Sequence, residues 1–213
     1  MRLLLIRHGA PDYANDSLTP LGHEQARLLA EAHSMVRIDE LYASPMGRAQ
    51  LTARYTAEAK RMPITTLDFL RELNGNYGER LWAWNMPGSE TFRGGASFTL
   101  ADWHEQIVYG PHMLGVAAEF WAQFDGFMAA QGYLREGQGY RTSRPDDERT
   151  LAFFFHAGAM LTLLAHLLHI PLPVVYAQFA CDPTSRTTLR FEPSDGFGVF
   201  RLERLNDLSH TER

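Results

Sequence analysis

Apolar residues in this chain follow two patterns, short continuous runs and longer stretches with helical spacing. The runs at residues 3–6 and 151–155 hold only apolar side chains, as is typical of strands buried on both faces of a parallel sheet. Further segments with the character of short strands are residues 41–43, 64–67, 187–191 and 199–205.

Helices are predicted between these strands, and two of them begin with the same signal. A hydroxyl residue that can cap the helix is followed by a proline at the first helical position. Thr19 and Ser44 supply the hydroxyls, and the helices run from Pro20 to near Met35 and from Pro45 to about Ala59. Helical spacing of apolar residues predicts two more helices, over residues 112–131 and from residue 157 through His169, before Pro171.

Strands and helices alternate over most of the chain, which favours an α/β fold with three layers, αβα, and a mostly parallel central sheet. Residues 74–149 break this rhythm, because glycines, prolines and aromatic residues surround the single helix 112–131. We expect this segment to be a helical and irregular insertion that covers the carboxyl-terminal edge of the sheet. Its polar part, residues 135–149, is predicted to be a mobile surface loop.

Composition narrows the class of protein. The chain has 213 residues, 45% of them hydrophobic, with a formal net charge of −5 and an isoelectric point near 6.0. An acidic chain disfavours nucleic acid and anionic membranes as main partners. No apolar window reaches the roughly 20 residues of a membrane span, and no signal peptide is visible. A single cysteine, Cys181, fits a reducing compartment, so a cytoplasmic globular protein is predicted.

Two histidines and two arginines are predicted to meet at one edge of the sheet. His8 follows the first apolar run and His156 follows the run of phenylalanines, while Arg48 falls in the first turn of the second helix. Arg7 directly precedes His8. Ligands of open α/β sheets bind beyond the carboxyl ends of the strands, close to helix N-termini. Imidazoles and guanidiniums gathered there form a receptor suited to a phosphoryl group.

Five short motifs occur in a fixed order along the chain. They are Leu-Ile-Arg-His-Gly at 5–9, Leu-Thr-Pro-Leu-Gly at 18–22, Ser-Pro-Met-Gly-Arg-Ala at 44–49 with Thr-Ala at 52–53, Leu-Arg-Glu-Leu at 70–73 and Phe-His-Ala-Gly at 155–158. In order and spacing the set resembles the histidine phosphatase superfamily, which includes the cofactor-dependent phosphoglycerate mutases. The resemblance implies one histidine-phosphatase-like domain over residues 1–213, with an insertion or lid at about 74–149.

The resemblance implies a role for each residue of the constellation. His8 would attack phosphorus and form a phosphohistidine, while its other ring nitrogen donates to a backbone carbonyl that fixes the tautomer. Arg7, Arg48 and His156 would hold the non-bridging oxygens, with His156 among the catalytic residues. Glu72 would protonate the leaving oxygen and then activate water, a double role that requires a raised pKa.

The chain departs from the family pattern at three places. Members of the family usually carry Glu-Thr after the glycine of the first motif and an asparagine a few residues later. Here Ala10 and Pro11 follow instead, and Asn15 is the candidate for the phosphate-binding asparagine. Ala157 stands where the family has the first of two glycines, and the loop after Glu72 has an altered glycine spacing. Alternative candidates for the acid are Glu79 and Glu90.

No cofactor and no metal are expected. His166 and His169 have helical spacing, but neither has a carboxylate or cysteine close by in the sequence, so packing or surface placement is favoured over a metal pair. Aromatic residues of the insertion are candidates for a lid over the substrate or for contacts in the core or in a homodimer. These residues are Trp82, Trp84, Trp103 and Tyr109.

The leading hypothesis is a phosphatase that acts on a small phosphorylated metabolite. A phosphoglycerate-mutase-type phosphoryl transfer and a non-catalytic phosphoryl-binding domain are the alternatives. A mutase must also hold a doubly anionic sugar acid, yet between residues 74 and 108 the only cationic side chains are Arg80 and Arg93. This scarcity favours hydrolysis, while the natural substrate and the oligomeric state stay open.

Overall fold

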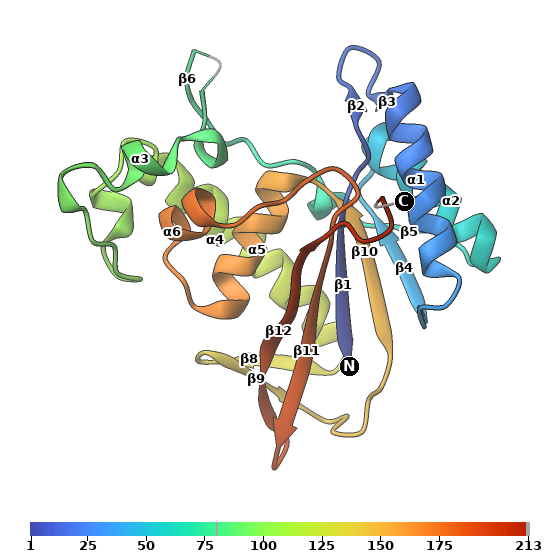
Figure 1. Ribbon diagram of the computed structural model, residues 1–213. Coiled ribbons are helices and arrows are strands. Elements are labelled where there is room, and N and C mark those ends of the chain that lie inside the picture. The colour runs from blue at the N-terminus through green and yellow to red at the C-terminus, as the bar shows by residue number, and fades with distance from the viewer. Residues whose placement is uncertain (80, 212–213) are drawn as a thin grey trace.

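An eight-stranded sheet forms the centre of the computed structural model, which describes residues 1–79 and 81–211 (Figure 1). Four neighbouring strands are parallel, in the order β5 (Thr65–Thr66), β4 (Glu40–Ala43), β10 (Thr150–Phe155) and β1 (Arg2–Arg7). Beyond β1 the sheet continues in antiparallel pairs with β11 (Arg186–Ser194), β12 (Phe197–Asp207), β9 (Gly139–Thr142) and β8 (Tyr133–Glu136). The predicted α/β class with a parallel core is confirmed, and the antiparallel half adds to it.

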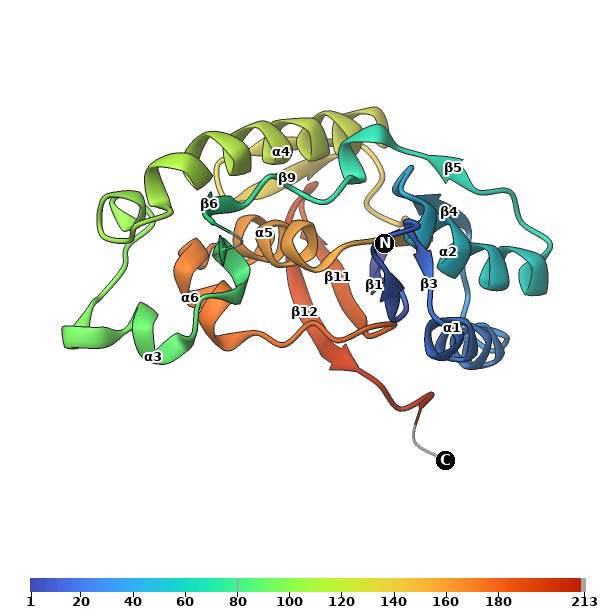
Figure 2. The same cartoon turned by 90° about the horizontal axis from the view of Figure 1, so that it is seen from above.

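Helices cover both faces of the sheet, as Figure 2 shows. Helices α1 (Pro20–His33) and α2 (Gly47–Lys60) lie on one face. On the other face lie α4 (Gly110–Ala130), α5 (Ala157–Leu168) and α6 (Leu172–Gln178). The side chains of β1 alternate between the two layers, because Leu4 and Ile6 pack with Leu29 of α1 whereas Leu3 and Leu5 pack with the α4 and α5 side. The predicted αβα layering follows from this alternation.

Local capping signals explain where the first two helices begin. The Thr19 hydroxyl accepts a hydrogen bond from the Gly22 amide at 3.1 Å, and Pro20 opens α1 as predicted. The same prediction is wrong for α2, which begins at Gly47 after Met46 without a side-chain cap. Ser44 instead directs its hydroxyl to His156, at 2.8 Å, and so takes part in the site described below.

The polar segment 135–149 is predicted as a mobile loop, and this is wrong for its first part. β8 and β9 form a hairpin whose turn includes Gly137 at a φ of 56°, a left-handed conformation that glycine adopts without strain. Tyr140 of β9 is buried and meets the ring of Phe200 edge to face, with centroids 5.7 Å apart. The sequence looks polar because the hairpin exposes its charged side chains on the outer face, as with the Arg141–Glu136 ion pair.

Short elements cover the carboxyl edge of the parallel strands. The hairpin of β2 (Pro11–Asp12) and β3 (Ser17–Leu18) and the hairpin of β6 (Asn76–Gly78) and β7 (Leu81–Trp82) project above that edge (Figure 1). Between β5 and α4 the remaining elements are single turns: η1 (Asp68–Leu70), η2 (Ala83–Asn85), α3 (Gly88–Thr91), η3 (Arg93–Gly95) and η4 (Trp103–Glu105). The expected irregular covering of this edge is therefore present.

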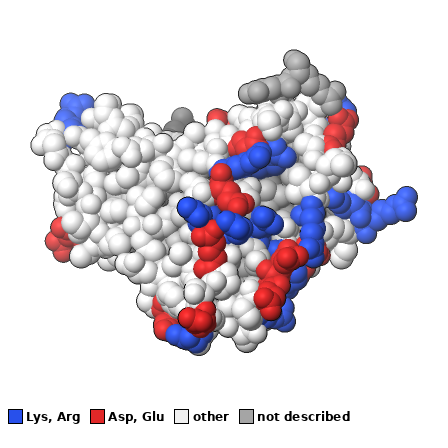
Figure 3. All heavy atoms as spheres, turned by 60° about the horizontal axis from the view of Figure 1, so that its bottom comes forward, with Lys and Arg blue, Asp and Glu red and all other residues white. Residues whose placement is uncertain are grey.

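One face of the molecule carries charges of both signs, interleaved rather than grouped (Figure 3). On the outer side of β11 and β12, Arg190 pairs with Glu192 and Glu203, and Arg201 also pairs with Glu192. Neither sign accumulates in this ladder, so it offers no basic stripe of the kind that nucleic acid binds. In the described part of the chain, no helix combines the length and apolar character that crossing a bilayer requires.

Two glycines let the backbone after β1 touch the start of α1. A Cβ at Gly9 would lie 2.7 Å from the Gly22 carbonyl oxygen, and a Cβ at Gly22 would lie 2.2 Å from the carbonyl oxygen of Ala10. Both distances are far below van der Waals contact with an immobile backbone atom. This close approach fixes the loop that carries His8 against α1, which gives the glycine of the second sequence motif a packing role.

Replacing Gly22 by alanine should therefore destabilise the protein by about 1–3 kcal/mol, because the new methyl group overpacks the contact with Ala10. Gly115 in α4 is the matched control, since nothing lies within 4 Å of its virtual Cβ. Gly115→Ala should raise the free energy of unfolding by about 0.5–1 kcal/mol through helix propensity. Urea denaturation of the two variants measures the change in the free energy of unfolding of each. Stabilisation by Gly22→Ala would contradict the packing role.

Candidate active site

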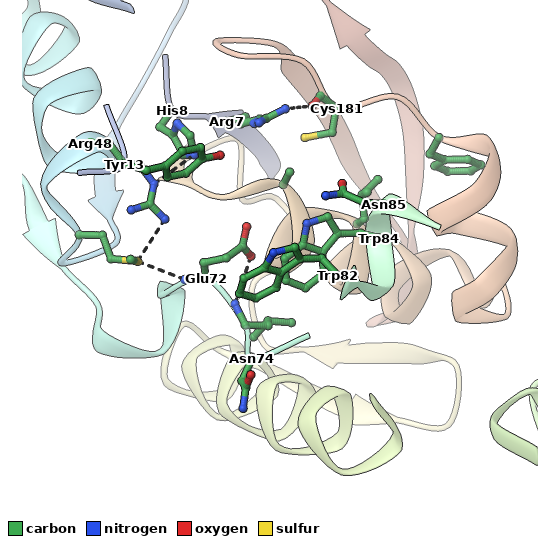
Figure 4. Close-up of a pocket in the computed structure, with 15 residues that line it drawn as sticks. Arg7, His8, Tyr13, Arg48, Glu72, Asn74, Trp82, Trp84, Asn85 and Cys181 are labelled. Atoms are coloured by element: carbon green, nitrogen blue, oxygen red, sulfur yellow. Dashed lines mark hydrogen bonds between the residues drawn. The ribbon is translucent and has the colours of Figure 1, made fainter. Parts of the chain in front are cut away.

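A cavity of about 850 Å³ opens at the carboxyl edge of the parallel strands. Arg7, His8, Arg48 and Glu72 line it, and Figure 4 shows Arg7 and His8 on one side of Glu72 and two tryptophans on the other. His156 lies fully buried beside this cavity, with its ring centroid 5.2 Å from that of His8. The structure thus brings together five of the six predicted site residues, and Asn15 is the exception.

The His8 imidazole is held in one tautomer by the backbone. Its Nδ1 lies 2.7 Å from the carbonyl oxygen of Gly9, which can only accept, so Nδ1 carries the proton and Nε2 does not. Nε2 instead accepts from Nε of Arg48 at 3.3 Å. Burial, together with the neighbouring Arg7 and Arg48, lowers the pKa of His8 to about 3. The predicted donation to a backbone carbonyl is confirmed, and it leaves a neutral ring whose unprotonated Nε2 is hydrogen-bonded to Arg48.

Arg48 is positioned by a residue that the sequence motifs do not include. The carboxylate of Asp16 accepts from Nη1 of Arg48 at 2.5 Å and from the Gly47 amide at 2.6 Å, at the N-terminus of α2. Asn15, predicted to bind phosphate, is exposed and donates to Asp12 at 2.7 Å, outside the cavity lining. The turn instead directs the next residue, Asp16, towards Arg48. The only sequence signal for this contact is that an acidic residue directly follows Asn15.

His156 is oriented by the hydroxyl of Ser44, 2.8 Å from Nε2. Burial lowers the pKa of His156 to about 2, with further contributions from His8, Arg48 and Arg7, so this ring is also neutral. Its Nδ1 is buried without a hydrogen-bond partner among the described residues, and the same holds for Nε of Arg7. Such unpaired polar atoms are costly in a closed core, and they are typical of a site that receives a ligand.

Glu72 meets the N-terminus of α5. Its carboxylate accepts from the amides of Leu73, Gly158 and Ala159, at 3.1, 3.2 and 2.9 Å. Burial nevertheless raises the pKa of Glu72 above its usual value, against the effect of these bonds. Two of these amides belong to Gly158 and Ala159, the residues after Ala157. Alanine at position 157 therefore does not interfere with these two hydrogen bonds. The alternative acids Glu79 and Glu90 are exposed and do not line the cavity.

The aromatic residues of the insertion divide into two groups. Trp82 and Trp84 line the cavity, with ring centroids 5.4 Å apart. Trp103 and Tyr109 are buried in the core with α4 and do not reach the cavity, so core contact is the alternative that holds for both. Local sequence did not separate the two groups, because both lie in the same irregular segment.

His166 and His169 have separate protein partners. Nε2 of His166 lies 3.0 Å from the carboxylate of Asp125 in α4, and Nε2 of His169 lies 2.6 Å from the Gln138 carbonyl. A carboxylate partner is thus present, contrary to the sequence expectation, because α4 packs beside α5. Among residues 1–79 and 81–211, no group of three or more His, Cys, Asp or Glu side chains could hold a metal ion.

The scarcity of cationic side chains in the segment 74–108 disfavours a mutase, and of its two arginines the structure describes one. Arg93 lines a separate hollow with Glu90, away from His8. Arg80 lies outside the described residues. Among the described residues of the segment 74–108, no cationic side chain therefore reaches the cavity.

Comparison with known proteins agrees with this geometry. Residues 3–95 match the model of the histidine phosphatase superfamily, branch 1. A Hydrogenobacter thermophilus protein, provisionally assigned as phosphoserine phosphatase 2, is 34% identical in an alignment of 93 residues. The alignment covers 38% of this chain and 46% of that protein. The chain thus spans about half the length of this relative.

Solved structures share the fold over nearly the whole chain. The phosphoserine phosphatase of Entamoeba histolytica, as a mutant in complex with phosphoserine, is 20% identical and superposes with a TM-score of 0.68 over 98% of each chain. A mycobacterial glucosyl-3-phosphoglycerate phosphatase is 24% identical, with a TM-score of 0.66 over 96% of this chain and 98% of its own. The segment 3–95, which holds His8, Arg48 and Glu72, is thus similar to the histidine phosphatase superfamily, branch 1.

Proposed function

We propose that this protein hydrolyses phosphate monoesters of small metabolites through a phosphohistidine on His8. The observation that carries the proposal is the state of His8, whose Nδ1 proton is held by the Gly9 carbonyl while its unprotonated Nε2 stands beside Arg48. A neutral imidazole with one unprotonated nitrogen is the form that can attack phosphorus, once the substrate phosphate takes over the hydrogen bond from Arg48. Sequence identity to a relative called a phosphoserine phosphatase supports the reaction class.

In the first step the substrate phosphate binds between the two arginines and the two histidines. Nε of Arg7 and Nδ1 of His156, which have no partner among the described residues, donate to its non-bridging oxygens. This role requires that the Ser44 hydroxyl, 2.8 Å from Nε2 of His156, donates to it and so keeps the proton on Nδ1. Nε2 of His8 then attacks phosphorus, the ester P–O bond breaks, and protonated Glu72 gives its proton to the leaving oxygen.

In the second step water cleaves the phosphohistidine. Glu72, now a carboxylate stabilised by the amides of Gly158 and Ala159, takes a proton from water as the water oxygen bonds to phosphorus. The P–N bond breaks, its electron pair returns to Nε2 of His8, and inorganic phosphate leaves. Burial of Glu72 favours the acid and the helix amides favour the anion, so both forms are accessible during one cycle.

The single domain over residues 1–213, the cytoplasmic location and a homodimer remain predictions alongside this proposal. The cavity supports hydrolysis over mutase chemistry, because its described lining beyond Glu72 offers no cation for the second acidic group of a phosphorylated sugar acid. A mutase would convert a phosphorylated acid to its isomer without net release of phosphate, and a binding domain would bind vanadate without turnover. Assays for released phosphate separate these outcomes.

Replacing His8 by alanine should abolish phosphate release, because it removes the unprotonated imidazole nitrogen that attacks phosphorus. Wild-type protein quenched in acid-free denaturant during turnover should carry a phosphohistidine that the variant lacks. His169→Asn is the matched control, since His169 caps the far end of α5 and does not line the cavity. Turnover of the His8 variant above a few per cent of wild type would refute the nucleophile assignment.

Glu72→Gln should reduce kcat for alkyl phosphates by about 10²–10⁴-fold, the usual contribution of a positioned acid–base group. The loss should be much smaller for p-nitrophenyl phosphate in single-turnover measurements of phosphoenzyme formation, since nitrophenolate leaves without a proton. Glu79→Gln and Glu90→Gln serve as controls, because both side chains are exposed outside the cavity. Equal losses with the two substrate types would argue against Glu72 as the acid.

The lowered pKa of His8 predicts a specific pH response. In the folded protein the ring should stay neutral, with the proton on Nδ1, from pH 7 down to about pH 4, because its pKa is about 3. The unfolded chain binds this proton near pH 6.5. The free energy of unfolding therefore decreases as pH falls from about 6.5 towards 3. Nitrogen-15 NMR of the imidazoles reports the titration, and protonation of His8 near pH 6.5 would contradict it.

A further inference from the structure

The cavity has two chemically different sides, with Glu72 between them (Figure 4). The side of Arg7, His8 and Arg48 is cationic and suits the phosphate. Beyond Glu72 the close-up shows Trp82 and Trp84 together with two neutral amides, Asn74 and Asn85. Apart from the phosphate side and Glu72, the described residues of the lining carry no charged side chain.

Trp84 is fixed in place by two glycines. A Cβ at Gly75 would lie 2.2 Å from the Trp84 ring, and a Cβ at Gly158 would lie 2.5 Å from it. The edge of this ring also meets Tyr176, with centroids 6.2 Å apart. The indole is thus wedged between the loop after Glu72 and the N-terminus of α5, and the altered glycine spacing of that loop makes room for it.

Trp82 lies beside Trp84 and is 38% exposed. The two ring planes are inclined by 31°, and their centroids are 5.4 Å apart. One indole is therefore anchored, while the next has surface available to a ligand in the cavity. Two adjacent aromatic side chains facing a leaving group offer a stacking surface of the kind that binds flat rings.

The size and charge of the cavity disfavour a small ionic leaving group. About 850 Å³ is within the range of sites for ligands of drug size, much more than a three-carbon phosphorylated acid fills. The carboxylate of phosphoserine would lose water beyond Glu72, where the described lining residues include no cationic side chain. A neutral ring would instead bury apolar surface against the indoles.

We propose that the substrate is the phosphate monoester of a neutral alcohol that carries a flat aromatic ring, of which a nucleoside is one chemical form. The ring stacks on Trp82 and Trp84, and the amide of Asn85, which lies beside Trp84, hydrogen-bonds its polar edge. This assignment rests on the proposed hydrolysis, which places the leaving oxygen at Glu72. It identifies Trp82 as a specificity-determining residue.

The test compares 2-phenylethyl phosphate, ethyl phosphate and phosphoserine as substrates. The first two release primary alkyl alcohols, so the proton transfer from Glu72 is matched and the ring is the main difference. Stacking on an aromatic side chain is worth about tenfold or more in binding. We expect kcat/KM to be about tenfold higher for 2-phenylethyl than for ethyl phosphate, and lowest for phosphoserine. Equal values, or a preference for phosphoserine, would overturn the assignment.

Variants of Trp82 test whether this side chain causes the preference for the aromatic ester. Trp82→Ala should bring the ratio of kcat/KM for the aromatic and ethyl esters close to one, and Trp82→Phe should keep most of it. Leu81→Ala is the matched control, because Leu81 is also exposed on β7 but does not line the cavity. An unchanged ratio in Trp82→Ala would refute the role of this residue.

The two proposals fail in different ways. If the wild-type protein releases phosphate from ethyl phosphate and phosphoserine, and His8→Ala does not, hydrolysis stands and an absent aromatic preference refutes the substrate class alone. If the wild-type protein releases phosphate from none of the three esters, both proposals are refuted.

Discussion

The parallel pairing of β1 with β10 is the constraint on which the site depends. Arg7 pairs with Phe155 in this register, so the next residue of each strand, His8 and His156, emerges at the same edge. Their rings stand 5.2 Å apart in a buried place next to two guanidiniums. Burial, together with the two guanidiniums, lowers their pKa values to about 3 and 2, so neither ring is charged there. The sheet thus enforces a pair of neutral imidazoles, which is what nucleophilic attack by one of them requires.

Helix N-termini complete the site around this pair. The start of α2 delivers Arg48, and Asp16 fixes both that guanidinium and the Gly47 amide at the helix end. The start of α5 supplies amides to Glu72, whose burial acts in the opposite direction on its pKa. In the proposed cycle this group must both lose and regain a proton, and burial and the helix amides act in opposite directions on its pKa.

The two sides of the cavity have different structural origins. The phosphate side comes from strand ends and helix starts, of which those carrying Arg7, His8 and Arg48 fall in the segment 3–95 that matches the superfamily model. The side beyond Glu72 comes from single turns and hairpins, where Gly75 and Gly158 admit the ring of Trp84. The regular layers of the fold thus supply the residues proposed for catalysis. The irregular segment that covers them supplies the tryptophans proposed to select the leaving group.

The sequence by itself determined the elements whose signals are local. Apolar runs marked β1 and β10, Thr19 and Pro20 marked the start of α1, and the strand-end rule placed Arg7 and both site histidines at one edge. Only the tertiary structure decided features that depend on distant neighbours. Asp16 rather than Asn15 contacts the site, because the turn after β2 sets which side chain faces α2.

Ser44 faces His156 instead of capping α2, because β4 and β10 are adjacent in the sheet. The hairpin of β8 and β9 forms because its tyrosines bury against strands far along the chain, a gain that the polar local sequence does not reveal. Local hydrogen bonding and periodicity are encoded within a few residues, whereas partner choice depends on which distant segments the packed layers bring into contact.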